Sequence, residues 1–327
     1  MKALVTGTTG FIGSHLVERL VNRGYSVRCM IRSSTKLEYV KGLPVEFAKA
    51  DFDDPESLDR AVDGVEYIFH IGGVTKSKDK EGYYRGNTLS TKNLLDSAAR
   101  SNRNVRRFLF ASSLTAVGPG NGSNPVDEAT PCHPITTYGR SKMEAEKECI
   151  SRFGELPITI IRPPAVYGPR DRDVFAFFNS VSKHIVPLSG FGKKILSFVH
   201  AFDLVDGMIS AVENPRGAGQ IYFISNDETY TWETLGKLAM KYLKTWAVPV
   251  RIPHAILYSI AAINQTIAAI GGRPALINIE KARDGAQSNW TCSSMKARNE
   301  LGFRCSLSLE EGVEGSIRWY RENGWLK

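Results

Sequence analysis

Short apolar runs alternate with helical patterns over the first two thirds of the chain. Between these runs lie stretches with apolar side chains at helical intervals, such as Leu89, Leu94, Leu95 and Ala98. This alternation predicts βαβ units on a parallel sheet. The predicted strands cover residues 2–7, 26–32, 45–51, 65–73, 106–113, 158–166 and 220–226.

One predicted helix has clear end signals. Asp54 stands at its N-cap, Pro55 at the first helical position and Gly64 just past its end. After about residue 171 the pattern becomes irregular and more helical. We expect one domain from residues 1–170 and 195–226, and a smaller, mostly helical substrate-binding lobe from residues 171–194 and 227–327.

Composition narrows the class of protein. The chain has 327 residues, a net charge of +8 and scattered Lys and Arg without a long basic run, which favours an anionic small molecule over nucleic acid. Its five cysteines form no CxxC pair and no metal-ligand spacing, so we expect neither a metal site nor disulfides. The N-terminus enters a predicted strand at once, which predicts a cytoplasmic protein.

One uncharged stretch, residues 255–272, complicates this interpretation. Asn264, Gln265 and Thr266 interrupt it at the middle, so it suits a buried or interface helix better than a membrane span. Association with a membrane surface is kept as the less favoured alternative.

Three glycines, Gly7, Gly10 and Gly13, separate the first strand from the first helix. A strand that turns sharply into a helix presents free N–H groups and the positive end of the helix dipole to a phosphate. A side chain at Gly10 would push phosphates away, and Gly13 lets the helix pack close to the sheet. The position of the motif in a βαβ chain predicts a bound dinucleotide.

The end of the second strand indicates which dinucleotide binds. An acidic residue there would favour an adenosine ribose, whereas this chain has Arg32, Ser33, Ser34 and Lys36. Cations and hydroxyls suit a 2′-phosphate, so NADP is favoured over NAD, which remains the alternative.

Tyr138 and Lys142 lie one helical turn apart and leave the same face of a predicted helix. This spacing alone is more typical of an exposed polar face. Together with the GxxGxxG spacing, however, it resembles the extended short-chain dehydrogenase/reductase superfamily, whose members are epimerase/dehydratase-like. The resemblance implies a Rossmann-type, doubly wound parallel sheet.

The same resemblance implies the cofactor site. Asp51 and Phe52 match the end of the third strand near the adenine, residues 70–74 match the end of the fourth, and Pro163 to Val166 match the segment behind the nicotinamide. The expected cofactor-binding residues are Gly7, Thr9, Gly10, Phe11, Ile12, Gly13, Arg32, Lys36, Asp51, Phe52, Ile71, Gly72, Gly73, Tyr138, Lys142, Pro163, Ala165 and Val166.

The resemblance also implies a catalytic set of Ser113, Tyr138 and Lys142, with Ser112 and Thr115 as near alternatives to Ser113. A free tyrosine has a pKa near 10, which is high for proton transfer at neutral pH. We expect the Lys142 ammonium to lower the pKa of Tyr138, and Ser113 to orient the substrate oxygen.

Further positions resemble the superfamily. Asn87 matches a helix-positioning asparagine, and Asp203 matches an acid that ties the two lobes together. His70, His133 and His200 are expected to be structural. Members of the superfamily often pair through two long helices, here 84–101 and 138–153, so a homodimer is expected.

The sequence predicts the activity less precisely than it predicts the fold. The stretch SSLTAVG carries no carboxylate next to the catalytic hydroxyl, which argues against dehydration. An exchangeable NADP favours a carbonyl reductase similar to dihydroflavonol 4-reductase or the 3β-hydroxysteroid dehydrogenase relatives. Apolar residues of the second lobe suit a partly hydrophobic substrate. An NAD-dependent nucleotide-sugar epimerase and a non-catalytic cofactor sensor remain alternatives.

Overall fold

The computed structural model describes residues 1–122, 124–271 and 278–326. Its main sheet has the strands β1 (Lys2–Thr6), β2 (Ser26–Ile31), β3 (Glu46–Lys49), β4 (Tyr67–His70), β5 (Arg107–Ala111), β6 (Ile158–Arg162) and β10 (Gln220–Phe223). They are all parallel, in the order β10-β6-β5-β4-β1-β2-β3. The predicted Rossmann-type sheet is confirmed, because each strand falls within one of the seven predicted runs.

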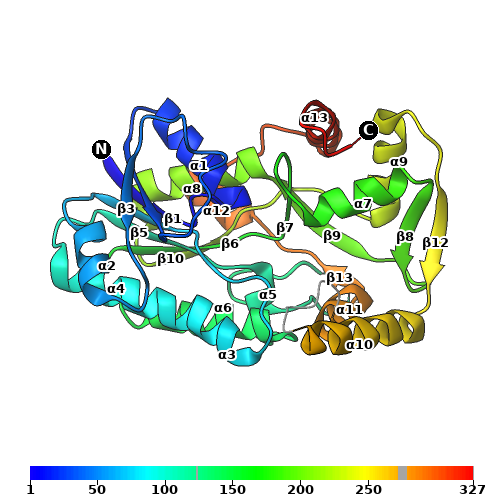
Figure 1. Ribbon diagram of the computed structural model, residues 1–327, viewed down its shortest axis with the longest axis horizontal. Coiled ribbons are helices and arrows are strands. Elements are labelled where there is room, and N and C mark those ends of the chain that lie inside the picture. The colour runs from blue at the N-terminus through cyan, green and yellow to red at the C-terminus, as the bar shows by residue number, and fades with distance from the viewer. Residues whose placement is uncertain (123, 272–277, 327) are drawn as a thin grey trace.

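Helices cover both faces of this sheet (Figure 1). One face carries α1 (Phe11–Asn22), α8 (Ala201–Glu213) and α12 (Met295–Leu301), and the other carries α2 (Pro55–Val62), α4 (Ser90–Ser101) and α6 (Thr137–Ile150). Side chains alternate along the strands, so Ala3 and Val5 enter the first core while Leu4 enters the second. Burial on both faces explains why these strands appear in the sequence as continuous apolar runs.

The predicted end signals of α2 are present in the structure. The Asp54 carboxylate accepts a hydrogen bond from the Ser57 backbone N–H, and Pro55 is the first helical residue. Gly64 has a φ of +67°, a backbone conformation that favours glycine.

The helix predicted around residues 84–101 is instead divided. The short helix α3 (Lys80–Tyr83) leads into the π-helix η1 (Tyr84–Leu89) and then into α4. A π-turn widens the helix, and such turns are frequent at functional sites. Asn87 lies within it.

The second lobe contains small sheets that the sequence analysis did not predict. β9 (Ile195–His200) pairs with β7 (Ala165–Tyr167), β11 (Thr229–Tyr230) and β13 (Asn289–Trp290), while β8 (Ile185–Ser189) pairs with β12 (Val248–Ile252). The remaining elements are α5 (Leu114–Val117), α7 (Asp173–Val181), η2 (Pro215–Gly217), α9 (Trp232–Leu243), α10 (His254–Ile270), α11 (Ile279–Ala286) and α13 (Leu309–Glu322).

The boundary between the two halves differs from the predicted one in two places. Ala297 of α12 and the following Phe303 pack into the core beside the main sheet, although residues 227–327 were assigned to the second lobe. Alternate residues of β9 enter different cores: Phe198 lies in the core of the second lobe and Val199 in that of the main sheet. A strand shared by two cores holds the halves together.

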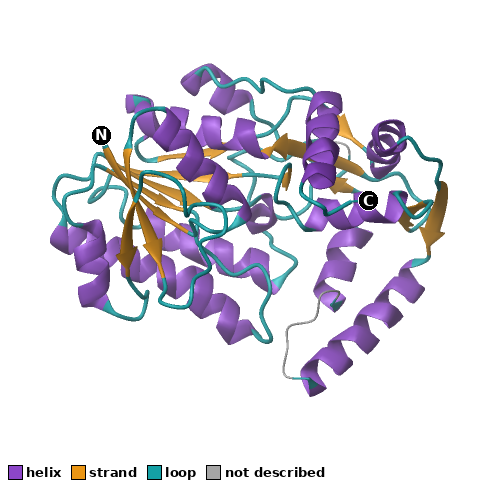
Figure 2. Ribbon diagram, turned by 45° about the horizontal axis from the view of Figure 1, so that its top comes forward, coloured by secondary structure: helices purple, strands orange, loops and turns teal. Residues whose placement is uncertain are grey.

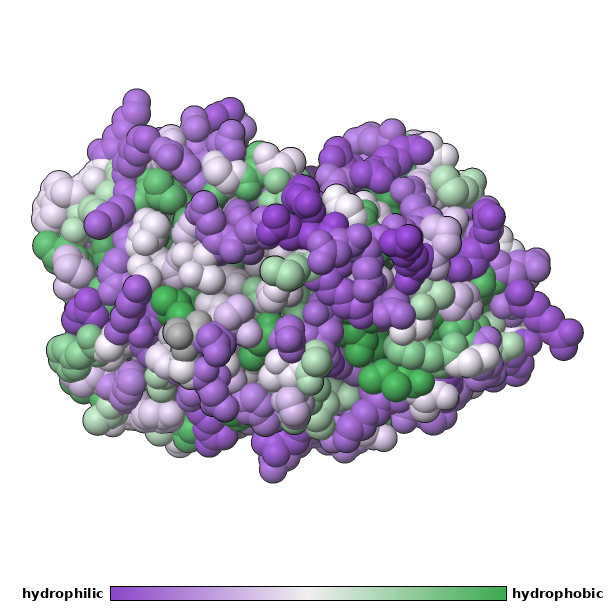
Figure 3. Space-filling view, turned by 180° about the vertical axis from the view of Figure 1, so that it is seen from behind, coloured by the Kyte–Doolittle hydropathy of each residue, from purple (hydrophilic) through white to green (hydrophobic). Residues whose placement is uncertain are grey.

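Most of the surface in Figure 3 is hydrophilic, with hydrophobic residues in separate small patches. Helix α10 lies at the margin of the molecule, where Ala261 is fully buried and four isoleucines are exposed. These side chains favour the interface alternative over a buried helix. No helix in the described part of the chain has the length and apolar character needed to cross a membrane.

Candidate active site

The turn from β1 into α1 forms a tight cradle. Gly7 has a φ of +68°, and a Cβ on Gly7 would lie 2.8 Å from Gly72 Cα. A Cβ on Gly13 would lie 2.1 Å from the Gly7 carbonyl oxygen. Neither position has room for a side chain, so the first turn of α1 comes close to the ends of β1 and β4. Gly10 is the N-cap of α1 and has no side-chain cap. The first turn is therefore free to bind a phosphate.

A cavity of about 670 Å³ opens in front of this cradle. Its floor is the start of α1, and its far side is the end of β4. Most of the predicted cofactor residues line it: Gly7, Thr9, Gly10, Phe11, Ile12, Gly13, Arg32, Lys36, Ile71, Gly72 and Gly73. The residues present therefore fit a dinucleotide, with the pyrophosphate over the free N–H groups of α1.

Sequence reasoning missed several cationic residues of the cavity. Arg170 and Arg172 line it from the loop after β7, and Lys76 lines it from the loop after β4. Arg170 adopts a φ of 71°, which is unusual for a residue with a side chain. It donates hydrogen bonds to Ser14 Oγ and Glu18 Oε1, at 3.1 and 2.6 Å, which hold its guanidinium beside α1.

The predicted adenosine end is more open. Arg32 and Lys36 are exposed and form no ion pair within the described residues. Arg32 and Phe52 also line a smaller adjoining cavity of about 210 Å³. Asp51 stabilises its own loop, because its carboxylate accepts a hydrogen bond from the Asp53 backbone N–H at 3.0 Å.

Tyr138 stands in the first turn of α6. The Thr136 side chain caps this helix by accepting a hydrogen bond from the Gly139 backbone N–H at 3.0 Å. Ser113 lies at the N-cap of α5, where its Oγ accepts hydrogen bonds from Thr115 N and Thr115 Oγ1 at 3.2 and 2.9 Å. Because Thr115 supplies both of these donors, the Ser113 hydroxyl proton is available to Tyr138 or to a substrate oxygen.

The pKa of Tyr138 does not follow the expectation. Burial raises the pKa of Tyr138 to about 12, while a side-chain hydrogen bond from Ser113 works in the opposite direction. Burial also lowers the pKa of Lys142 to about 8, so this lysine is itself a weakened cation. Burial is the largest influence on the pKa of Tyr138 and Lys142 is not among the groups that change it, so the lysine does not produce the expected lowering in this structure.

Lys142 points toward the end of β4. Its Nζ lies 4.4 Å from the centre of the Phe110 ring, and a Cβ on Gly73 would come within 3.6 Å of it. Gly73 also lines the cofactor cavity. The ammonium thus lies between α6 and the cavity.

The carboxyl ends of β4 and β5, the glycine cradle and helix α6 thus converge beside one cavity. A family model described as "NAD dependent epimerase/dehydratase family" matches residues 3–225. The chain belongs to this family.

The names of proteins that are similar to this chain specify different activities. Ceramide reductase of Caulobacter vibrioides is 26% identical, over 98% of this chain and 95% of its own. Sterol demethylase protein B of Methylococcus capsulatus is 28% identical, and the match covers both chains completely. A UDP-glucose 4-epimerase structure with UDP-glucose from Thermotoga maritima superimposes with a TM-score of 0.80 at 25% identity, covering 99% of each chain. The family is thus a family of enzymes, and its members catalyse more than one reaction.

In this family member the π-helix supports the catalytic helix. Asn87 Oδ1 accepts a hydrogen bond from Val74 N at 2.7 Å, and its Nδ2 donates to Ser141 Oγ at 2.9 Å. Ser141 Oγ in turn donates to the Tyr138 carbonyl at 2.7 Å. Asn87 therefore connects the loop after β4 to α6, in line with the positioning role that the resemblance implies.

A second support comes from the other lobe and was not foreseen. The Glu280 carboxylate of α11 accepts hydrogen bonds from Thr137 N at 3.0 Å and Thr137 Oγ1 at 2.6 Å. Thr137 directly precedes Tyr138, and a carboxylate at a helix N-terminus is favoured by the helix dipole. These two residues are separated by more than a hundred positions in the chain, and no spacing pattern connects them.

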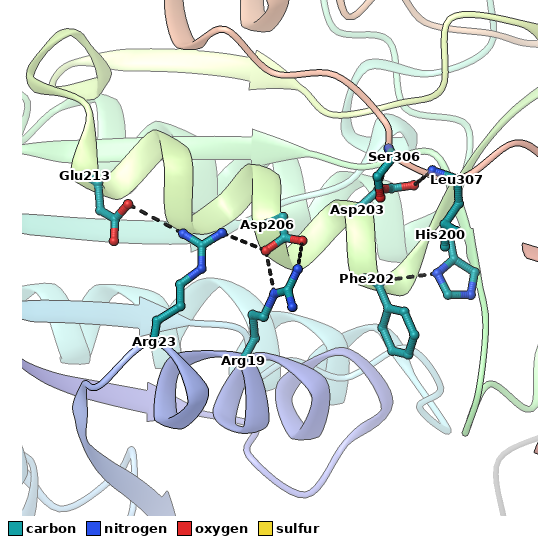
Figure 4. Close-up of polar contacts among 9 residues, drawn as sticks. All are labelled: Arg19, Arg23, His200, Phe202, Asp203, Asp206, Glu213, Ser306 and Leu307. Carbon is teal, nitrogen blue, oxygen red and sulfur yellow. Dashed lines mark hydrogen bonds and ion pairs between the residues drawn. The ribbon is translucent and has the colours of Figure 1, made fainter.

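Asp203 ties the halves together as expected (Figure 4). Its Oδ1 accepts hydrogen bonds from Ser306 N at 2.8 Å and Ser306 Oγ at 2.6 Å, which connects α8 to the loop before α13. Beside it, Arg19 of α1 and Arg23, the C-cap of this helix, form ion pairs with Asp206 of α8.

The histidines predicted to be structural have structural partners. His70 is fully buried, between Thr6 Oγ1 at 2.8 Å and Thr91 Oγ1 at 3.0 Å, and burial lowers its pKa to about 3. His200 caps α8, and the His133 ring contacts the Pro119 carbonyl at 2.9 Å. The described residues hold no cluster of side chains suited to a metal ion.

Proposed function

We propose that the protein is an NADP(H)-dependent oxidoreductase that reduces the carbonyl group of an apolar substrate. The observations that support this proposal are the side-chain hydrogen bond between Ser113 and Tyr138 and the position of Lys142 Nζ near Gly73, which lines the cofactor cavity. When bound, the nicotinamide supplies or accepts the hydride. Tyr138 acts as general acid toward the substrate oxygen, and a pKa near 12 keeps it protonated for this role at neutral pH. Ser113 holds the same oxygen through its free hydroxyl proton.

Preference for NADP is supported by Arg32 and Lys36. Both lie at the end of β2, are exposed and line the cofactor cavity, and neither is neutralised by an acidic partner in the described part of the chain. A planar guanidinium can bind a 2′-phosphate through paired, charge-assisted hydrogen bonds. NADPH is usually exchanged after each turnover, which suits a reductase.

An apolar substrate is supported by the relatives and by the second lobe. The names of two full-length relatives specify a ceramide and a sterol. A further cavity in the second lobe, of about 170 Å³, is lined mainly by apolar groups, among them Ile195, Leu196, Trp232 and Trp290. Such a lining favours an apolar ligand with a few polar contacts.

Epimerisation of a nucleotide sugar is the second candidate. It is favoured by the likeness to the UDP-glucose 4-epimerase over almost the whole of both chains. An epimerase oxidises and then reduces the same molecule, so it consumes no net cofactor. A purely sensing role is the least supported, since all three groups of the predicted catalytic set are present.

The test is to incubate the purified full-length protein with NADPH and a panel of hydrophobic ketones, sugar nucleotides being assayed separately. Stoichiometric loss of NADPH with alcohol formation is expected. Tightly held NAD with interconversion of UDP-glucose and UDP-galactose would replace this proposal by the epimerase. Nucleotide binding without either reaction would support the sensor.

A further inference from the structure

The positive charge of the protein is confined to two parts of the chain. Residues 174–202 and 234–279 contain no Asp or Glu, whereas the rest of the chain has 34 acidic and 34 basic residues. The whole net charge of +8 therefore lies on these two segments. Their basic residues are Lys183, Lys193, Lys194, Lys237, Lys241, Lys244, Arg251 and Arg273, the last of which is outside the described residues.

The two segments meet at the end of the molecule farthest from the main sheet (Figure 1). β12 pairs with β8 in parallel, from Val248 opposite Ile185 to Ile252 opposite Ser189, and α10 follows directly. We call β8, β12 and α10 the distal end. Figure 2 shows α10 at the margin of the molecule, with the main body on one side only.

Several of these cations are free. Lys183, Lys193, Lys237 and Lys244 form no ion pair within the described residues. Lys241 and Arg251 pair with Glu310 and Glu233, which lie outside the two segments. The two segments that form the distal end therefore carry an uncompensated positive charge.

One stripe of the exposed surface of α10 is apolar. Ile256, Ile260, Ile263 and Ile267 are spaced by four, three and four residues, so they form one stripe along the helix. They are 51%, 39%, 60% and 63% exposed. We call these residues the isoleucine stripe. Another face of the helix packs on the protein, where Ala261 is buried and Leu257 lies near Gly285 of α11.

The β8–β12 pair adds further exposed apolar side chains. Ile185 and Val248 are opposite each other in the register, and Val250 follows on the same face. Trp246 and Phe191, which are 64% and 72% exposed, lie next to the two strands. Exposed tryptophan beside apolar and cationic groups is typical of the membrane–water interface.

From these features we propose that the distal end docks on an anionic lipid bilayer, with the isoleucine stripe inserted at the level of the headgroups. An apolar helix stripe on two segments with a net positive charge is attracted by both parts of such a surface. A second copy of the chain would also cover the stripe, but a symmetric contact would bring two uncompensated positive ends together. Electrostatics therefore favours the bilayer over self-association.

The docking surface is close to the catalytic helix. α10 packs on α11, with Gln265 Oε1 accepting a hydrogen bond from Ile279 N at 3.3 Å. α11 in turn holds the start of α6 through Glu280 and Thr137. A single helix thus separates the bilayer-facing stripe from the helix that carries Tyr138.

The test is co-sedimentation of the full-length protein with vesicles of phosphatidylcholine alone or mixed with phosphatidylglycerol. The wild type is expected to bind the mixed vesicles at least about tenfold more strongly, and to be released by salt. The variant Ile263→Asn with Ile267→Asn is expected to lose about tenfold in this binding. Met295→Asn is the matched control, because Met295 is 62% exposed but lies on α12; it should bind as the wild type does.

A second variant keeps the stripe intact and tests the charge alone. Replacing Lys183, Lys193 and Lys244 by Gln is expected to weaken binding to mixed vesicles and to leave binding to phosphatidylcholine unchanged. Equal binding by all variants, or no binding of the wild type to mixed vesicles, would overturn the proposal. So would sedimentation equilibrium that shows a dimer, if the stripe variant dissociates it and neither protein binds vesicles.

Vesicle binding needs no turnover and no nucleotide, so it is independent of the proposed reduction. A protein that binds vesicles but reduces no ketone would contradict only the proposed function. A protein that reduces ketones but ignores vesicles would contradict only the docking surface.

Discussion

The half built on the main sheet and the distal end of the second lobe differ in where they carry charge. Outside residues 174–202 and 234–279 acids and bases are equal in number, and Arg32, Arg170 and Arg172 gather around one cavity of the first half. The two segments that form the distal end hold eight bases and no acid, and α10 within them exposes four isoleucines. Positive charge focused into a cavity selects a small anionic ligand. Positive charge spread beside an apolar surface attracts an extended anionic surface.

The largest expected effect concerns the centre of the first half. Tyr138→Phe removes the general acid while keeping the ring, so we expect kcat to fall by about 10²–10⁴-fold. Nucleotide affinity should change little, because the cradle is unaltered. The measurement is steady-state turnover with NADPH, together with nucleotide titration by fluorescence.

Tyr83→Phe is the control for this change. The Tyr83 ring lies 6.3 Å from that of Tyr138, and its hydroxyl interacts with the Thr75 carbonyl, at 3.4 Å, and with the Ser77 backbone. We expect turnover within a few-fold of the wild type. A comparable loss in both variants would mean that the site needs two phenols for packing, and would refute the role of Tyr138 as the acid.

The second prediction tests whether different cationic residues of the cavity contribute differently to the binding of NADPH and NADH. Arg32→Ala is expected to weaken NADPH binding by about 10–100-fold and NADH binding little, because a 2′-phosphate loses a charge-assisted contact. Arg172→Ala, on a different loop of the same cavity, should weaken both nucleotides alike. An equal loss of both nucleotides in Arg32→Ala would argue for NAD as the cofactor.

The two halves also differ in how far the sequence predicts them. The main sheet and the cradle follow from apolar runs and glycine spacing, which are local signals. The small sheets of the second lobe have strands of two to six residues with no clear alternation. Arg170 and Glu280 reach the site only through the tertiary fold, since Arg170 contacts Glu18 and Glu280 contacts Thr137, both remote in the chain.

Glu280 therefore tests how the second lobe supports the half built on the main sheet, with a smaller expected effect. Glu280→Gln keeps the shape of the side chain but removes the charge at the start of α6, which costs about 0.5–2 kcal/mol at a helix N-terminus. We expect kcat to fall by about threefold to tenfold with KM for NADPH unchanged, since the residue positions Tyr138 and does not touch the cradle.

The pH profile distinguishes positioning from simple loss of stability. If Glu280 aligns Tyr138, the variant should show a shifted pH dependence of kcat as well as a lower maximum. Glu314→Gln is the control, because Glu314 forms an exposed ion pair with Arg318 on α13, far from α6 in the chain. An unchanged profile with a lower melting temperature would leave Glu280 a structural role alone.

The smallest effects concern two buried ionisable groups with opposite pH dependence. His70, beside the main sheet, has a pKa of about 3, below its ordinary value of 6.5. The unfolded chain binds the proton first, so His70 makes the fold less stable as the pH falls below 6.5. Asp284 of α11 has a pKa raised to about 7 from 3.8, by burial and by the nearby Glu280. Its folded state binds the proton first, so stability is lost as the pH rises through 7.

Asp284→Asn removes this second titration while keeping the size of the side chain. One carboxylate oxygen, Oδ1, is buried without a hydrogen-bond partner in the described structure, so ionisation there is uncompensated. The variant should match the wild type near pH 4 and be more stable at pH 8, by up to a few kcal/mol, because one pKa unit corresponds to about 1.4 kcal/mol. Thermal unfolding at both pH values measures the difference. Superimposable curves would show that water reaches Asp284, and that α11 is less tightly packed against the second lobe than the main sheet is against its helices.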